Sequence, residues 1–249
     1  MLLSGKSILI TGAARGIGYA VSRAAHVHGA NVVMADIDAV MLAEAAKSIP
    51  GASHLAMDVS EDSSIRAALE GLSVLDGVIN NAAILDESNS ATVQGARFTR
   101  VMDVNALSTV KVTQACLPLL RASADAAVVN TLSTQSFFGQ ANALSYAAAK
   151  GAALNITRCM AVDFAPLSIR VNGVAPGFID TRMAIMASGA HEHETDWFKD
   201  IYVGARKIPM ARAGTPEDCA GAYIFLLSSL SCYITGQVIK VDGGLTATY

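Results

Sequence analysis

The sequence is poor in charged residues, aromatic residues and cysteine. Asp, Glu, Lys and Arg make up 16% of its 249 residues, against about 25% in an average protein. The 18 basic and 21 acidic side chains give a net charge of −3 without a basic stripe, which leaves nucleic-acid binding with little electrostatic support. The four cysteines are too widely spaced for zinc pairs and too few for a disulfide scaffold. We therefore expect buried, reduced thiols.

Long apolar runs, linkers and repeats are also missing. No run approaches 18 apolar residues, and the start, from Met1 to Lys6, lacks the apolar region of a signal peptide. This predicts a cytoplasmic protein that does not bind a membrane. No change in composition marks a domain boundary, and 52% of the residues are hydrophobic. Residues 1–249 are therefore expected to form one domain with a large core.

Short runs rich in Val and Ile alternate with helical stretches. The expected strands are Ser7–Thr11, Asn31–Asp36, Ser53–Asp58, Gly77–Asn80, Ala127–Leu132, Ile169–Ala175 and Gln237–Val241. The expected helices are Ile17–His28, Ala39–Ile49, Glu61–Leu72, Phe98–Leu120, Ser145–Phe164 and Pro216–Leu227, with Asp38, Ser60 and Thr215 as N-caps. Almost continuously apolar strands separated by helices are typical of an α/β fold whose parallel sheet is buried on both faces.

One segment, residues 178–210, breaks this rhythm. It has weak periodicity, two glycines and the polar cluster His191-Glu192-His193-Glu194. It follows a strand end, where open α/β sheets bind ligands, and we interpret it as a substrate loop or lid. The alternative is a tolerated surface insertion. The spacing of the histidines is not that of an HExxH metal site, so we expect a solvated or substrate-facing cluster and no metal.

A glycine-rich turn joins the first strand to the first helix. Gly12, Gly16 and Gly18 follow the pattern GxxxGxG, and glycines at such a turn let backbone amides approach a pyrophosphate at the helix N-terminus. Asp36 ends the second strand, where a carboxylate can accept hydrogen bonds from the adenosine ribose and would repel a 2′-phosphate. Ile37 follows where a phosphate site would need a cation. Arg15 could reach a 2′-phosphate, but the pattern favours NAD over NADP.

Tyr146 and Lys150 are four residues apart on an expected helix and so share one face. Tyrosine needs a pKa lowered by roughly three units, or about 4 kcal/mol, to act as a base near neutral pH. A cation ~6 Å away supplies about 3 kcal/mol at an effective dielectric constant near 20. Lysine together with a positively charged nicotinamide can reach the required total.

Further motifs occur in a fixed order along the chain. They are Thr11–Gly18, Asp58-Val59, Asn80-Asn81-Ala82-Ala83, Val104-Asn105, Ser133, Tyr146-Ala-Ala-Ala-Lys150, Pro176-Gly177 with Thr181, and Val241-Asp242-Gly243-Gly244. Together they resemble the short-chain dehydrogenase/reductase superfamily, specifically its compact branch, and the resemblance covers essentially the whole chain. It implies a three-layer, doubly wound Rossmann fold with a parallel seven-stranded sheet.

The resemblance also implies roles for individual residues. Tyr146 is the expected general base, and Lys150 is expected to lower its pKa and bind the nicotinamide ribose. Ser133 is expected to position the substrate oxygen, and Asn105 to hold a water in a proton relay. Gln140 is a further expected substrate contact. The expected cofactor contacts are Gly12, Arg15, Gly16, Ile17, Gly18, Asp36, Ile37, Asp58, Val59, Asn81, Ala82, Val104, Tyr146, Lys150, Pro176, Gly177, Ile179 and Thr181.

One position departs from the superfamily pattern, because Ala83 stands where glycine is usual. A positive φ there would strain the backbone. The motifs predict an NAD-dependent dehydrogenase of secondary alcohols such as sugars, polyols, hydroxy acids or alicyclic alcohols. Two alternatives remain open: an NADPH-dependent ketone or 3-oxoacyl-thioester reductase, and a non-catalytic NAD-binding regulator.

The low charge content also bears on assembly. It predicts apolar surface outside the core, which a homo-oligomer would cover. The helices Phe98–Leu120 and Ser145–Phe164 resemble the pair that forms a four-helix bundle between subunits in this superfamily. The apolar stretch Gly236–Leu245 suggests a second contact. We therefore expect a homotetramer with D₂ symmetry.

Overall fold

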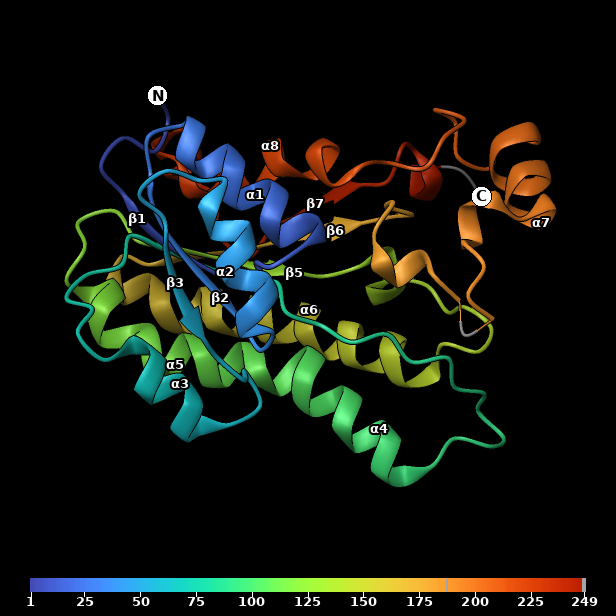
Figure 1. Cartoon of the computed structure of the whole chain (residues 1–249), viewed down its shortest axis with the longest axis horizontal. Helices are drawn as coiled ribbons and strands as arrows, with labels where there is room; N and C mark the ends of the chain where they lie inside the picture. The colour runs from blue at the N-terminus through green and yellow to red at the C-terminus, as the bar shows by residue number, and fades with distance from the viewer. Residues whose placement is uncertain (187, 248–249) are drawn as a thin grey trace.

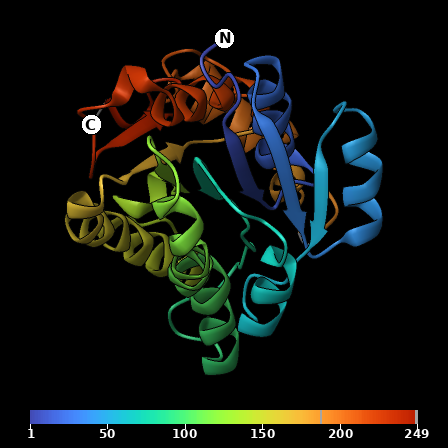
Figure 2. The same ribbon diagram turned by 90° about the vertical axis from the view of Figure 1, so that its left-hand side faces the viewer.

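The structure, a computed structural model, describes residues 1–186 and 188–247. Its centre is a seven-stranded sheet in the order β3-β2-β1-β4-β5-β6-β7, and every neighbouring pair of strands is parallel. Helices cover both faces of the sheet (Figures 1 and 2). The predicted three-layer α/β fold is thus confirmed. The strands are β1 (Ser7–Thr11), β2 (Asn31–Asp36), β3 (Ser53–Ala56), β4 (Gly77–Asn80), β5 (Ala127–Thr131), β6 (Arg170–Pro176) and β7 (Val238–Val241).

The main helices divide between the two faces of the sheet. They are α1 (Gly16–Val27), α2 (Ala39–Lys47), α3 (Asp62–Leu69), α4 (Gly95–Met102), α5 (Ser108–Arg121), α6 (Leu144–Phe164) and α8 (Pro216–Leu227), with a short α7 (Asp196–Phe198). In β1, Ile8 and Ile10 pack with residues of α1 and α8, whereas Leu9 packs with residues of α3 and α5. Because successive side chains of a strand point to opposite faces, one short apolar strand serves two cores.

Two sequence predictions of helix structure were wrong in detail. Ser60 does not cap α3: the N-cap is Glu61, and the Ser60 hydroxyl donates to Asp58 Oδ1 at 2.7 Å instead. The predicted helix Phe98–Leu120 is not continuously α-helical, because a π-helix (Asp103–Leu107) separates α4 from α5. The caps at Asp38 and Thr215 are confirmed.

The cysteines also differ from the expectation. All four are free; Cys116 and Cys219 are buried, but Cys159 and Cys232 are exposed. Burial raises the pKa of both buried thiols to about 12. In the described part of the chain, no helix has both the length and the apolar character needed to cross a bilayer.

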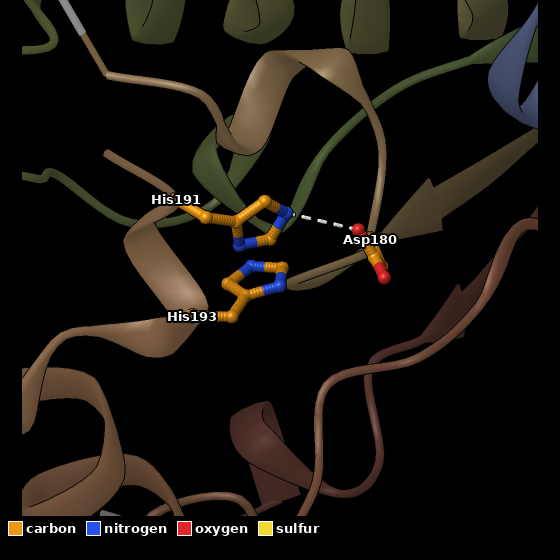
Figure 3. A group of neighbouring side chains, drawn as sticks. All are labelled: Asp180, His191 and His193. Carbon is orange, nitrogen blue, oxygen red and sulfur yellow. Dashed lines mark hydrogen bonds and ion pairs between the residues drawn. The ribbon is translucent and has the colours of Figure 1, made fainter. Parts of the chain in front are cut away.

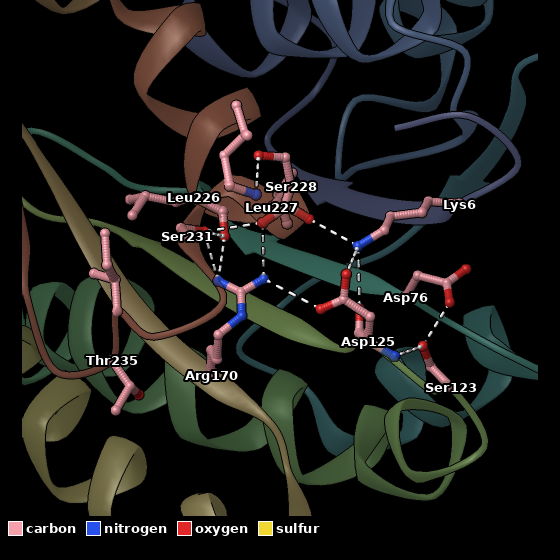
Figure 4. Close-up of polar contacts among 12 residues, drawn as sticks. Lys6, Asp76, Ser123, Asp125, Arg170, Leu226, Leu227, Ser228, Ser231 and Thr235 are labelled. Carbon is pink, nitrogen blue, oxygen red and sulfur yellow. Dashed lines mark hydrogen bonds and ion pairs between the residues drawn. The ribbon is translucent and has the colours of Figure 1, made fainter. Parts of the chain in front are cut away.

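An ion-pair network joins the starts of β1, β5 and β6 (Figure 4). Lys6 Nζ lies 2.7 Å from Asp125 Oδ2, and Arg170 Nη2 lies 3.5 Å from Asp125 Oδ1. Arg170 also donates to the carbonyl of Leu226, at the end of α8, at 2.7 Å. Burial raises the pKa of Asp125, but the charges and hydrogen bonds of Lys6 and Arg170 lower it by more. The net pKa therefore lies below the usual range. The network links the amino ends of these strands, and the candidate site lies at their carboxyl ends.

Candidate active site

A cavity of about 1090 Å³ runs along the carboxyl ends of the strands. This is the edge at which doubly wound sheets bind ligands. Of the site residues predicted from the sequence, only Gly18 and Asn105 do not line it. Those that do are Gly12, Arg15, Gly16, Ile17, Asp36, Ile37, Asp58, Val59, Asn81, Ala82, Val104, Ser133, Gln140, Tyr146, Lys150, Pro176, Gly177, Ile179 and Thr181.

The glycine-rich turn forms one wall of this cavity. Gly12 has a φ of +66°, and a Cβ on it would lie 2.9 Å from the Cα of Ala82. Gly18 has no room for a Cβ, which would collide with the carbonyl oxygen of Gly12. Asn81 fixes the turn, since its Nδ2 donates to the carbonyls of Thr11 at 3.0 Å and Gly12 at 3.2 Å. The turn thus packs backbone against backbone, and Gly12 and Gly16 line the cavity at the start of α1, a position that fits a dinucleotide pyrophosphate.

Tyr146 and Lys150 come from α6 and face the same cavity. Lys150 Nζ lies 5.8 Å from the centre of the Tyr146 ring and donates to the Thr131 carbonyl at 2.7 Å. Burial raises the pKa of Tyr146 to about 12, although its hydrogen bond with Ser133 acts in the opposite direction. Burial lowers the pKa of Lys150 to about 8. Tyr146, Ser133 and Lys150 thus bring a phenol, a hydroxyl and an amine together near the end of β5.

Comparison with known proteins agrees with this arrangement. The family model described as "Enoyl-(Acyl carrier protein) reductase" matches residues 12–246. The 3-oxoacyl-(acyl-carrier-protein) reductase FabG of Chlamydia muridarum is 34% identical, and the alignment covers 98% of each chain. The 2-(S)-hydroxypropyl-CoM dehydrogenase 3 of Xanthobacter autotrophicus is also 34% identical, over 98% of each chain. The chain belongs to the short-chain dehydrogenase/reductase family.

Among solved structures, the aldohexose dehydrogenase of Thermoplasma acidophilum superimposes with a TM-score of 0.87 at 27% identity, over 99% of this chain and 96% of that chain. As a short-chain dehydrogenase/reductase, the protein is an oxidoreductase that binds a nicotinamide cofactor and acts on a small molecule.

The end of the cleft where the adenosine ribose is expected is built around Asp36. Its Oδ2 accepts from the Ala14 amide and its Oδ1 from the Asp38 amide, each at 3.0 Å. Arg15 Nη2 lies 2.9 Å from Asp38 Oδ2. The guanidinium that sequence reasoning considered a possible partner for a 2′-phosphate is therefore paired with a carboxylate. Ile37 is 65% exposed and contributes no charge.

Asn105 lies in the π-helix, is buried, and does not reach the cavity surface. Its Oδ1 accepts from the Ile84 amide and its Nδ2 donates to the Ile84 carbonyl, both at 2.8 Å. It therefore holds the loop after β4 in place, and its relay role stays a prediction. π-Helical turns are frequent at functional sites. The backbone φ of Ala83 is not positive, so the strain considered for this position does not arise.

Several cavity residues were missed by sequence reasoning, among them Glu87, Arg182, Tyr202 and Lys207. From the polar cluster that the sequence predicted to be solvated or substrate-facing, Glu192 and His193 line the cavity. Glu87 and Glu192 belong to different loops, yet burial and the charge of Glu87 raise the pKa of Glu192. A charged residue in an irregular segment carries no periodic signal. Periodicity therefore could not place Glu87, Arg182 and Lys207 in the cavity. Gln140 accepts from Gln135 Nε2 at 2.7 Å.

The segment 178–210 packs through aromatic rings. Phe178 lies 4.6 Å from Tyr202 and 5.2 Å from Phe198, measured between ring centres. Phe198 is buried, whereas Trp197 is 47% exposed and does not line the cavity. Phe198 therefore packs inside the segment, and Trp197 lies on its surface. The predicted lid role of this segment remains an expectation.

Proposed function

We propose that this protein is an NAD-dependent dehydrogenase that oxidises a secondary alcohol to a ketone. The observation that carries the proposal is the group formed by Ser133, Tyr146 and Lys150 in the same cavity as the glycine-rich turn. A protein that only bound the dinucleotide would not need a phenol and a hydroxyl next to a buried amine. This argues against a non-catalytic regulator.

The protein's part in the reaction is to move one proton. The ionised Tyr146 accepts the proton of the substrate hydroxyl as the carbinol C–H bond breaks, and Ser133 donates a hydrogen bond to the substrate oxygen. A bound oxidised nicotinamide would supply the hydride acceptor and an additional positive charge. Burial raises the pKa of Tyr146 to about 12. Positive charge beside the phenol is therefore required before it can act as a base near neutral pH.

The cleft fits the cofactor along its whole length. Asp36 would accept hydrogen bonds from the adenosine ribose, and Asp58 with Val59 would frame the adenine. Lys150 would bind the second ribose. Pro176, Gly177, Ile179 and Thr181 would seat the carboxamide, on a loop that the Gly177 amide anchors to the Val241 carbonyl at 2.9 Å.

The preference for NAD rests on Asp36 and on the pairing of Arg15 with Asp38. We expect kcat/KM with NAD⁺ to exceed that with NADP⁺ by at least ~100-fold, about 2.7 kcal/mol of discrimination. Replacing Asp36 by Ala together with Ile37→Arg should erode the ratio. Asp38→Ala alone should erode it by a smaller factor, since it frees Arg15. Equal use of both cofactors by the wild type would refute this part of the proposal.

A second function is favoured by the FabG relative and by the description of the family model. This is reduction of a ketone or a 3-oxoacyl thioester with NADPH. It would require use of NADPH despite Asp36. The side of the cavity expected to face the substrate carries Arg182 and Lys207 but also Glu87 and Glu192, so it is not a predominantly basic surface for an acidic carrier protein.

The test is a screen of NAD⁺ and NADP⁺ reduction with sugars, polyols, hydroxy acids and alicyclic alcohols, beside NADPH oxidation with 3-oxoacyl thioesters. For any substrate found, Tyr146→Phe should lower kcat by about 10²–10⁴-fold and leave NADH binding within twofold. Retention of more than a few per cent of activity would show that Tyr146 is not the base. Turnover only with NADPH and thioesters would favour the alternative.

We also propose a cytoplasmic homotetramer. Apolar side chains are exposed on both helical segments expected at the interface: Leu107 is 46% and Val162 is 73% exposed. Near the second expected contact, Leu230 is 64% exposed and Tyr233 fully exposed. Light scattering should report four chains of 25.8 kDa, about 103 kDa in total. A stable single chain with full activity would refute the tetramer.

A further inference from the structure

Three side chains with metal-binding chemistry lie next to one another in the chain that follows β6 (Figure 3). One of them, His193, lines the cavity. Asp180 lies in the loop after β6, and His191 and His193 lie at the short helical turn Glu192–Glu194. One possible ligand atom from each residue lies within 4.8 Å of the other two. His191 Nε2 is 3.0 Å from Asp180 Oδ1, and the two imidazole ring centres are 5.0 Å apart.

A second observation points to a ligand at this place. The Nδ1 atoms of both His191 and His193 are buried and have no hydrogen-bond partner. Buried polar atoms are normally satisfied, so each unsatisfied one needs an explanation. Two buried ring nitrogens without partners, next to a carboxylate, are therefore available to a ligand.

We propose that Asp180, His191 and His193 bind a divalent transition-metal ion, for which Zn²⁺ is the appropriate probe. Two imidazoles and one carboxylate suit Zn²⁺ and leave a fourth position open. At metal–ligand distances of about 2.1 Å, the ligand atoms of a tetrahedral site lie about 3.4 Å apart. The three side chains must therefore move together by only a little over an ångström.

The fold shows what such an ion would do. The chain doubles back between Asp180 and the histidines, with an antiparallel bridge between Ile185 and His191. The ion would cross-link the end of this loop to the chain that follows β6. His193 also lines the substrate cavity, so the cross-link would fix one wall of that cavity. The site is thus a metal clip that orders the segment 178–210, and it does not depend on the proposed reaction.

Local spacing could not reveal this site. The histidines are two residues apart, and the carboxylate precedes the first by eleven residues. Neither interval belongs to a familiar metal motif, which is why the sequence predicted no metal here. The turn at 182–184 and the antiparallel bridge between Ile185 and His191 bring the three residues together.

The first experiment measures Zn²⁺ binding to tag-free, metal-depleted protein by calorimetry. One ion per chain is expected. His191→Asn and His193→Asn should each weaken binding at least 10-fold, since each removes a ligand, and Asp180→Asn should weaken it as well. His54→Asn is the matched control, because His54 is exposed on β3 and its loss should change nothing. Circular dichroism and NADH binding establish that the variants are folded.

A second experiment identifies the ligands and the cross-link. Co²⁺ bound in place of Zn²⁺ should give visible bands without a thiolate charge-transfer band, which would instead report the exposed Cys159 or Cys232. Zn²⁺ should slow tryptic cleavage after the exposed Arg182 and Lys199 at least threefold in the wild type but not in His193→Asn. Absence of binding, equal binding by the wild type and His191→Asn, or a thiolate band would each overturn the proposal. Turnover is not needed for any of these measurements, so failure of the proposed function would leave them valid.

Discussion

Two walls of the same cavity are built in different ways. The cofactor wall, formed by the glycine-rich turn and the ends of β1 and β2, is anchored by buried strands and by hydrogen bonds to backbone groups, such as those of Asn81 and Asp36. The substrate wall, formed by residues 178–210, consists of short helical turns joined by contacts between aromatic side chains. The first wall is held rigidly by these contacts, and the second can change shape with less disruption of the core.

The difference has a simple physical origin. Where backbone segments are hydrogen-bonded and closely packed, there is almost no space for additional atoms. Aromatic side chains on a half-exposed segment, by contrast, can rearrange. The pairs around Phe178 and Tyr202 are worth about 0.5–1.5 kcal/mol each beyond burial of their surface. The comparison therefore predicts large effects of small changes in the cofactor wall and small effects of larger changes in the substrate wall.

The largest effect on stability should come from Gly18→Ala. The new methyl group would collide with the carbonyl oxygen of Gly12, and such overpacking against backbone should cost about 3 kcal/mol of unfolding free energy. Gly139→Ala is the matched control, because nothing lies within 4 Å of a Cβ there; it should change stability by less than about 0.5 kcal/mol. Urea unfolding measures both. Equal stabilities for the two variants would remove the basis of the comparison.

The next effect concerns the buried amine of Lys150. Its pKa is about 8 in the folded chain, below its ordinary 10.5, so above pH 8 the unfolded chain binds more protons at this residue. Burying the protonated amine lowers the unfolding free energy by its full amount below pH 8. This destabilisation is relieved as the pH rises and the folded chain loses the proton. The unfolding free energy of wild type minus that of Lys150→Met should therefore increase by about 2 kcal/mol between pH 8 and pH 10.

Taking this difference is necessary because other buried groups act in the opposite direction. The raised pKa values of Cys116 and Cys219 lower stability at alkaline pH, but they do so equally in both proteins. Tyr146 contributes only above its ordinary pKa of 10. If the difference in unfolding free energy between the wild type and Lys150→Met does not change between pH 8 and pH 10, Lys150 is solvated in the folded chain.

The smallest effect should come from the substrate wall. Trp197 is 47% exposed and meets Tyr202 edge-on, with ring centres 5.0 Å apart. Trp197→Ala should lower stability by about 1 kcal/mol or less. Since it alters the wall and not the proton-transfer group, it should change KM more than kcat. A larger loss of kcat than of substrate affinity would place Trp197 in the chemistry and contradict this division.

Local sequence patterns were enough to predict the secondary-structure elements and the order of the site motifs along the chain. Apolar runs of strand length predicted β1, β2 and β4 to the residue, because parallel buried strands carry a strong local signal. The interval of four between Tyr146 and Lys150 placed both side chains on one face of α6, because that interval is close to one helical turn. The glycine-rich turn was equally readable, since its short-range backbone geometry excludes side chains.

The folded structure determines which charged side chains from separate parts of the sequence lie together. It paired Arg15 with Asp38, brought the charge of Glu87 near Glu192, and placed Asp180 beside the two histidines. It also introduced the π-helix at Asn105, where the side chain binds the Ile84 backbone. These contacts join loops whose paths depend on packing and not on periodicity. A local pattern therefore identifies the residues able to do chemistry, whereas the folded chain decides which of them act together.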